Sequence, residues 1–95
     1  MKIIWTREAL ENIIEIEEYI YQDNPSKATE FTDFLIDKCE YLINNPEIGR
    51  IVPELSDPRI RELIVKNYRI VYRYIDEKIQ ILTVFEGHRL LPLDY

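Results

Sequence analysis

The spacing of apolar residues changes halfway along the chain, and this change is the strongest constraint on the fold. In residues 6–45 apolar side chains recur every three or four positions, the spacing typical of helices with one buried face. From residue 59 onwards, β-branched and aromatic residues fill short runs that are divided by turns of two or three residues, as in antiparallel strands. The sequence therefore predicts helices first and a sheet afterwards, the order of an α+β fold.

The helical part divides into two amphipathic helices. A short strand over residues 3–5 ends at Thr6, which caps a helix predicted to run to about Asp23. Asn24 caps the second helix, Pro25 occupies its first position, and the helix ends near residues 44–46. The apolar stripes of the two helices are Ala9, Ile13, Ile16 and Ile20, and then Ala28, Phe31, Leu35, Cys39 and Leu42. We expect a helical hairpin that covers one face of a sheet.

Three strands are predicted after a loop over residues 47–53: residues 59–65, 68–75 and 79–85. Because the last run is almost continuously apolar, we expect it to be a central strand. The prediction is a single domain over residues 1–95, with a short N-terminal strand and a two-helix hairpin packed on an antiparallel sheet that ends in a three-stranded meander. One core between helices and sheet should contain Ile13, Ile16, Ile20, Phe31, Leu35, Val71, Ile81 and Val84.

Composition excludes several classes of protein. The two glycines are isolated, so no phosphate-binding loop is present, and one histidine with one cysteine cannot form a usual zinc site. We therefore expect neither a cofactor nor a metal. No apolar run approaches the roughly 20 residues of a membrane span, and the start lacks the apolar stretch of a secretion signal. Together with the lone Cys39, this predicts a cytoplasmic protein.

Charge is distributed unevenly along this acidic chain, which has 12 basic and 18 acidic residues and a formal net charge of −6. Residues 59–73 contain five basic residues and only one acidic residue, Glu62. Arg59 and Arg61 share one face of a strand, as do Arg69 and Arg73 on the next strand, so a suitable register would form a four-arginine cluster. Such a cluster suits phosphate or carboxylate groups. The alternative is an edge strand that is kept soluble by its charge.

Histidine and tyrosine side chains lie near this basic stretch in the sequence. His88 and Arg89 follow the last strand and are expected at the rim of the sheet. His88 is either ordinary surface polarity or, with Arg89 and the terminal Tyr95, part of an acid–base site, since the usual histidine pKa of about 6.5 is close to neutral. The strand tyrosines either pack within the fold or stack on nucleic-acid bases; they are Tyr68, Tyr72 and Tyr74.

The chain resembles the RelE/ParE superfamily of toxins from type II toxin–antitoxin modules, and the motifs that carry the resemblance cover nearly all of it. The first set looks most like the ParE branch: Trp5-Thr6-x-x-Ala9, Tyr19-Ile20, Asn24-Pro25, Asn45-Pro46 and Gly49-Arg50. The second set is shared by both branches: Arg61-Glu62-Leu63, residues 68–73, residues 79–84 and Gly87-His88-Arg89. The resemblance implies two helices on an antiparallel sheet, in agreement with the periodicity, and an antitoxin protein as partner.

The two branches imply different targets. ParE-like toxins inhibit DNA gyrase by binding it, and no catalytic residues can be transferred from them. RelE-like toxins cleave ribosome-bound mRNA without a metal, using the RNA 2′-OH as nucleophile. In a RelE-like mechanism, Arg69 and Arg89 would stabilise the phosphate and His88 or Tyr95 would move a proton. Binding of antitoxin or phosphate would fall to Arg59, Arg61 and Arg73.

The net charge favours the ParE-like alternative, because a chain at −6 is repelled by the ribosome whereas a protein target makes no such demand. We therefore expect a gyrase inhibitor, which is not an enzyme. The alternative is a ribosome-dependent mRNA endonuclease, and a non-toxic interaction domain is a third. In the toxin interpretations, the antitoxin is expected to cover the sheet face around Arg59, Arg61 and Arg69.

Overall fold

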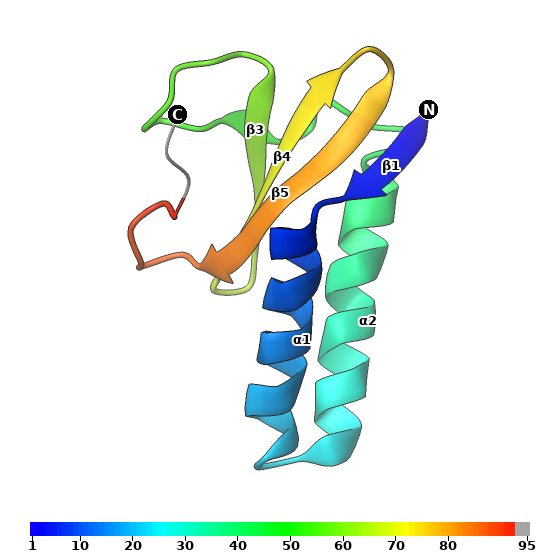
Figure 1. The fold of residues 1–95 in the computed structure, drawn as a ribbon, viewed down its shortest axis with the longest axis vertical. Coiled ribbons are helices and arrows are strands. Elements are labelled where there is room, and N and C mark those ends of the chain that lie inside the picture. The colour runs from blue at the N-terminus through cyan, green and yellow to red at the C-terminus, as the bar shows by residue number, and fades with distance from the viewer. Residues whose placement is uncertain (93–95) are drawn as a thin grey trace.

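The computed structural model describes residues 1–92 and contains two helices and five strands (Figure 1). Their bounds in chain order are β1 Lys2–Trp5, α1 Arg7–Tyr21, α2 Pro25–Tyr41, β2 Arg50–Ile51, β3 Ile60–Val65, β4 Tyr68–Ile75 and β5 Lys78–Glu86. The helices form a hairpin that packs on one face of the sheet and extends beyond it at the end that carries the α1–α2 turn. The predicted α+β fold is confirmed.

Both helices begin at the predicted caps. The Thr6 side chain accepts a hydrogen bond from the Ala9 amide at 3.2 Å and donates one to the Ile81 carbonyl at 2.7 Å, so it ties the start of α1 to β5. The Asn24 side chain accepts from the Lys27 amide at 3.2 Å, and Pro25 follows it as the first residue of α2. Neither helix of the described chain is long and apolar enough to cross a membrane.

The sheet has the strand order β1-β5-β4-β3-β2. Strands β3, β4 and β5 form the predicted antiparallel meander, with β5 in the interior of the sheet between β1 and β4. Two features differ from the prediction. Strand β1 pairs with β5 in parallel, so the sheet is mixed, and Arg50–Ile51 forms an edge strand inside the predicted loop. A strand of two residues is too short to produce a periodic pattern, so it could not be predicted from apolar spacing.

Both faces of the sheet are covered, each by its own apolar cluster. The cluster under the helices includes Leu35, Ile70, Tyr72 and Ile81. We call the side that carries no helix the open face. Its buried cluster consists of Val52, Ile60, Val71, Leu82 and Phe85, with Leu55 and Leu91 packed against it. The predicted single core is therefore wrong for Val71, because this residue alternates with Ile70 and Tyr72 and so points away from the helices. The other predicted core residues lie in or against the cluster under the helices.

Candidate functional site

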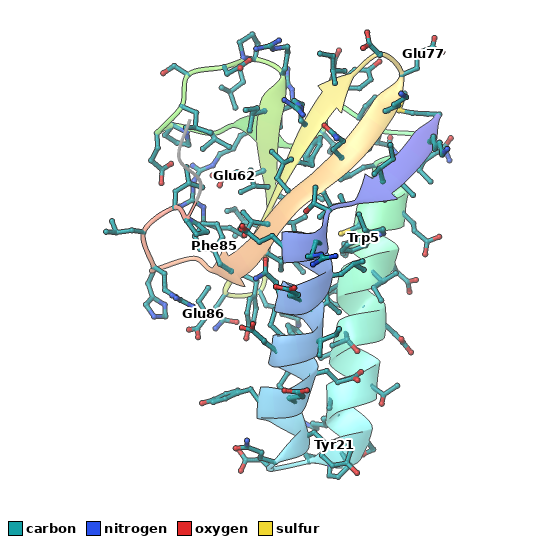
Figure 2. All side chains as sticks on the ribbon, viewed as in Figure 1. Trp5, Tyr21, Glu62, Glu77, Phe85 and Glu86 are labelled. Carbon is teal, nitrogen blue, oxygen red and sulfur yellow. The ribbon has the colours of Figure 1, made fainter. Side chains whose placement is uncertain are left out.

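Four charged side chains cross the open face and form a network that we call the arginine–glutamate network. Arg50 lies on β2, Glu62 on β3 and Arg69 on β4, which are neighbouring strands, and Glu54 lies in the loop after β2. Glu62 reaches this face because it alternates along β3 with residues that face the helices. Figure 2 labels Glu62 beside the strands and Phe85 near the end of β5, the two residues that border Arg69.

The carboxylate of Glu62 is the buried centre of this network. Its side chain is 0% exposed, one oxygen accepts from Arg50 Nε at 2.6 Å, and the other accepts from Arg69 Nε at 2.5 Å. A buried carboxylate that lacked partners would cost several kcal/mol, and the two arginines offset this cost. Arg69 is itself nearly buried, with 9% of its side chain exposed.

Arg69 also binds a second carboxylate. Its Nη1 and Nη2 atoms donate to the two oxygens of Glu54 at 3.0 and 2.9 Å, a bidentate pair. This hydrogen bonding holds the pKa of Glu54 below its usual value and raises the pKa of Arg69. The guanidinium also lies 5.0 Å from the centre of the Phe85 ring. All three guanidinium nitrogens of Arg69 therefore donate to carboxylates. The network contains two positive and two negative charges, so it has little positive potential to attract an anion.

The register of β3 and β4 is not the one that would bring the four arginines together. Arg61 pairs in register with Tyr72 and shares the helix-side face with Leu63 and Val65, whereas Arg69 and Arg73 lie on the open face. The three arginines proposed for binding each have an internal partner: Arg59 contacts Asp57 at 2.9 Å, Arg61 donates to the Gly49 carbonyl at 2.9 Å, and Arg73 donates to Gln80 at 2.8 and 2.6 Å. The same contact with Arg59 lowers the pKa of Asp57.

A tightly held loop positions Arg50 for the network. The Tyr72 hydroxyl donates to the Pro46 carbonyl at 2.7 Å and accepts from the Gly49 amide at 3.0 Å, and Tyr72 is fully buried. At Gly49 a Cβ atom would lie 2.7 Å from both the Glu62 carbonyl oxygen and the Tyr72 hydroxyl, so any side chain would displace this loop. Tyr72 therefore packs within the fold and anchors this loop, which agrees with the packing interpretation of the strand tyrosines and not with stacking on bases.

Of the four residues expected in a RelE-like mechanism, the three that the structure describes line two separate hollows. Arg69 and His88 line a shallow hollow of about 400 Å³, whereas Arg89 lines a separate hollow between α1 and the segment after β5. His88 is mostly exposed and lies 3.4 Å from Glu86. Tyr95 falls outside the described residues, so its predicted role stays a prediction.

The chain has one cysteine, Cys39, and it is buried. Burial, with a smaller effect of Glu40, raises the pKa of Cys39 to about 12, so its thiol stays protonated and unreactive at neutral pH. In residues 1–92, no three His, Cys, Asp or Glu side chains are placed to hold a metal ion.

Sequence reasoning missed Glu62, Glu54 and Arg50 as partners of Arg69. A signal for Glu62 was present, because it shares its strand face with the apolar residues Ile60 and Ile64. A carboxylate in such a position, within a stretch rich in arginine, indicates a buried ion pair. Glu54 had no comparable signal, since it lies in an irregular loop.

Comparisons with known proteins agree with this architecture. The sequence model of the ParE toxin of the type II toxin–antitoxin system parDE matches residues 3–91. None of the curated proteins compared with the chain matches it. A structure of the chromosomal ParDE system from P. aeruginosa has a TM-score of 0.77 and 22% identity, over 90% of this chain and 95% of that one.

RelE structures are similar as well. The isolated E. coli RelE toxin has a TM-score of 0.63 and 17% identity, over 93% of this chain and 85% of that one. An E. coli RelE mutant in complex with a peptide of the antitoxin RelB has a TM-score of 0.61 and 18% identity, over 93% and 84%. Fold and sequence together define a toxin of the RelE/ParE superfamily from a type II toxin–antitoxin system. Within that class, the chain belongs to the ParE toxin family.

Proposed function

We propose that this toxin arrests growth in the cytoplasm by binding DNA gyrase, as ParE-like toxins do, and that a cognate antitoxin neutralises it. Membership of the ParE family supports the proposal. The main structural support is the hydrogen bonding of Arg69, whose three guanidinium nitrogens all donate to Glu54 and Glu62.

Phosphate chemistry needs a cation that is free to meet developing negative charge. Here a phosphate that approached Arg69 would also meet two carboxylates. Glu62 is fully buried, and its withdrawal would leave Arg50 and Arg69 without their shared partner. Binding to a protein surface requires no such rearrangement, so inhibition through contact fits the charges better than RNA cleavage does.

RelE-like mRNA cleavage is the second candidate. Its support is the hollow that Arg69 and His88 share, together with the similarity to RelE. In this mechanism Glu54, which is 43% exposed, would move aside, Arg69 and Arg89 would stabilise the phosphate, and His88 or Tyr95 would protonate the leaving oxygen. The roles of Arg59, Arg61 and Arg73 in binding antitoxin or phosphate stay predictions.

The two candidates are separated by assaying the purified chain for inhibition of gyrase supercoiling and for translation-dependent mRNA cleavage. We expect inhibition of supercoiling without cleavage, and we expect His88→Ala to arrest growth as the wild type does. Lys78→Ala is the matched control for Arg89→Ala, since both remove an exposed cation and Lys78 lies at the far end of β5. Wild-type mRNA cleavage that is lost in His88→Ala and Arg89→Ala but kept in Lys78→Ala would overturn the proposal. Production of the chain without any effect on growth would contradict both candidates.

A further inference from the structure

An apolar groove lies on the helical side of the molecule, away from the arginine–glutamate network. It has a volume of about 480 Å³ and runs between the end of α1, α2 and the turn that joins β3 to β4. Its lining residues are Ile20, Lys27, Glu30, Phe31, Phe34 and Lys66. Phe31 packs 5.5 Å from the ring of Tyr68 and 6.4 Å from the ring of Phe34, so aromatic rings that remain half-buried form the floor.

Three lysines surround this floor, and we call the whole feature the lysine groove. The Nζ atoms of Lys38 and Lys66 lie 5.3 and 5.7 Å from the centre of the Phe34 ring, and Lys27 lines the groove beside Glu30. All three lysines are exposed. Among residues 1–92, none of them has a carboxylate within 4.0 Å, whereas Arg50, Arg59 and Arg69 all do.

The charge around the groove makes this gathering of lysines informative. Residues 7–41, which include both helices, contain ten acidic and three basic residues. The two lysines of α2, Lys27 and Lys38, both lie at the groove, and Lys66 approaches it from the sheet. An acidic partner is therefore repelled by the acidic helical surfaces and attracted to the lysines at the groove. The apolar floor additionally requires an apolar side chain, which a free anion or a phosphate backbone lacks.

We infer that the lysine groove docks an acidic segment of a protein partner, which inserts an apolar side chain against Phe31 and Phe34 and places Asp or Glu side chains beside Lys27, Lys38 and Lys66. This inference rests on the proposed function in one respect: it takes the partner to be the cognate antitoxin. It moves the expected contact from the arginines of the sheet, which have internal partners, to the lysines, which have no carboxylate within 4.0 Å in residues 1–92.

The test is calorimetric titration of the chain with the antitoxin encoded beside its gene. The groove variant is Lys27→Glu/Lys66→Glu, and the matched control Lys2→Glu/Lys78→Glu makes the same change at the paired starts of β1 and β5. We expect the groove variant to bind about tenfold more weakly or worse, and the control to change by less than about twofold. Raising the salt concentration should weaken wild-type binding more than that of the groove variant.

Phe34→Ala tests the apolar part of the docking site. It should also weaken binding, and its circular dichroism and thermal unfolding show whether the chain remains folded. Because the lysine reversals change only exposed side chains, they keep the test decisive even if Phe34→Ala unfolds.

Three outcomes would overturn the inference. If the chain arrests growth and binds the antitoxin, and both double variants bind as the wild type does, the groove is not the docking site although the proposed function stands. If the chain neither arrests growth nor binds the antitoxin, the proposed function fails as well. If the chain alone sediments as an oligomer that the groove variant dissociates, the occupant is a second copy.

Discussion

The arginine–glutamate network and the lysine groove are both rich in cations, yet they differ in whether those cations already have partners. Arg69 and Arg50 share the buried Glu62, and Glu54 completes the balance of charge. At the groove, Lys38 and Lys66 lie over the ring of Phe34, and in the described part of the chain none of the three lysines has a carboxylate partner. A basic stretch of sequence is therefore not equivalent to a basic surface, because the register of the strands decides whether each charge is neutralised within the fold.

Glu62→Gln should destabilise the fold strongly, because Glu62 is the buried centre of the arginine–glutamate network. Removing this buried carboxylate leaves Arg50 without its partner and Arg69 with Glu54 alone, and we expect the free energy of unfolding to fall by about 3 kcal/mol. Urea denaturation followed by circular dichroism measures this change. Glu54→Gln is the matched control, because it removes the same charge from a side chain that is 43% exposed, and it should cost no more than about 1 kcal/mol. Equal losses in the two variants would show that burial does not distinguish the two carboxylates.

A smaller effect is expected at the loop that positions Arg50. In Gly49→Ala the added methyl group would lie 2.7 Å from the Glu62 carbonyl oxygen and the Tyr72 hydroxyl, and we expect a loss of about 1–3 kcal/mol in the free energy of unfolding. Gly87→Ala is the control, since its Cβ would meet no atom closer than 3.4 Å. Urea midpoints of both variants test the difference. A wild-type midpoint for Gly49→Ala would mean that the loop moves without cost.

The sequence was sufficient for the fold but not for the open face. The caps at Thr6 and Asn24, the helical stripes and the meander follow from local rules of spacing and capping, and the structure confirms them. Arg61 and Arg69 lie on different faces of the sheet because of the register between β3 and β4, and the pairing of Arg69 with Glu54 depends on the path of a loop. Both are long-range consequences of packing, so composition and spacing alone indicated a cluster that does not form.

The ion pair between Arg69 and Glu54 should make the stability of the chain depend modestly on pH. Because Arg69 lowers the pKa of Glu54 in the folded chain, this pair stabilises the fold at pH values above the ordinary value of 4.5, and the stabilisation is lost as the pH falls through the lowered pKa. The difference in unfolding free energy between the wild type and Glu54→Gln should therefore be at most about 1 kcal/mol at pH 7 and should shrink below pH 4.5. Asp57 responds to pH in the same direction, so only the difference between the two proteins isolates Glu54. A difference that grows as the pH falls would contradict the ion pair.

The smallest effect is expected at the lysine groove itself. Lys66→Gln removes a charge that has no carboxylate partner within residues 1–92, and it keeps an unbranched side chain at a position where φ is 57°. We expect the free energy of unfolding to change by less than about 0.5 kcal/mol, measured by urea denaturation at low and at high salt. Arg69→Gln is the contrasting variant, because it leaves Glu62 with one partner fewer and should cost several times more. A large loss in Lys66→Gln would mean that the groove lysines hold the fold together, as the arginines do. A change near zero would mean that the fold does not depend on the charge of Lys66, which is then available to a partner.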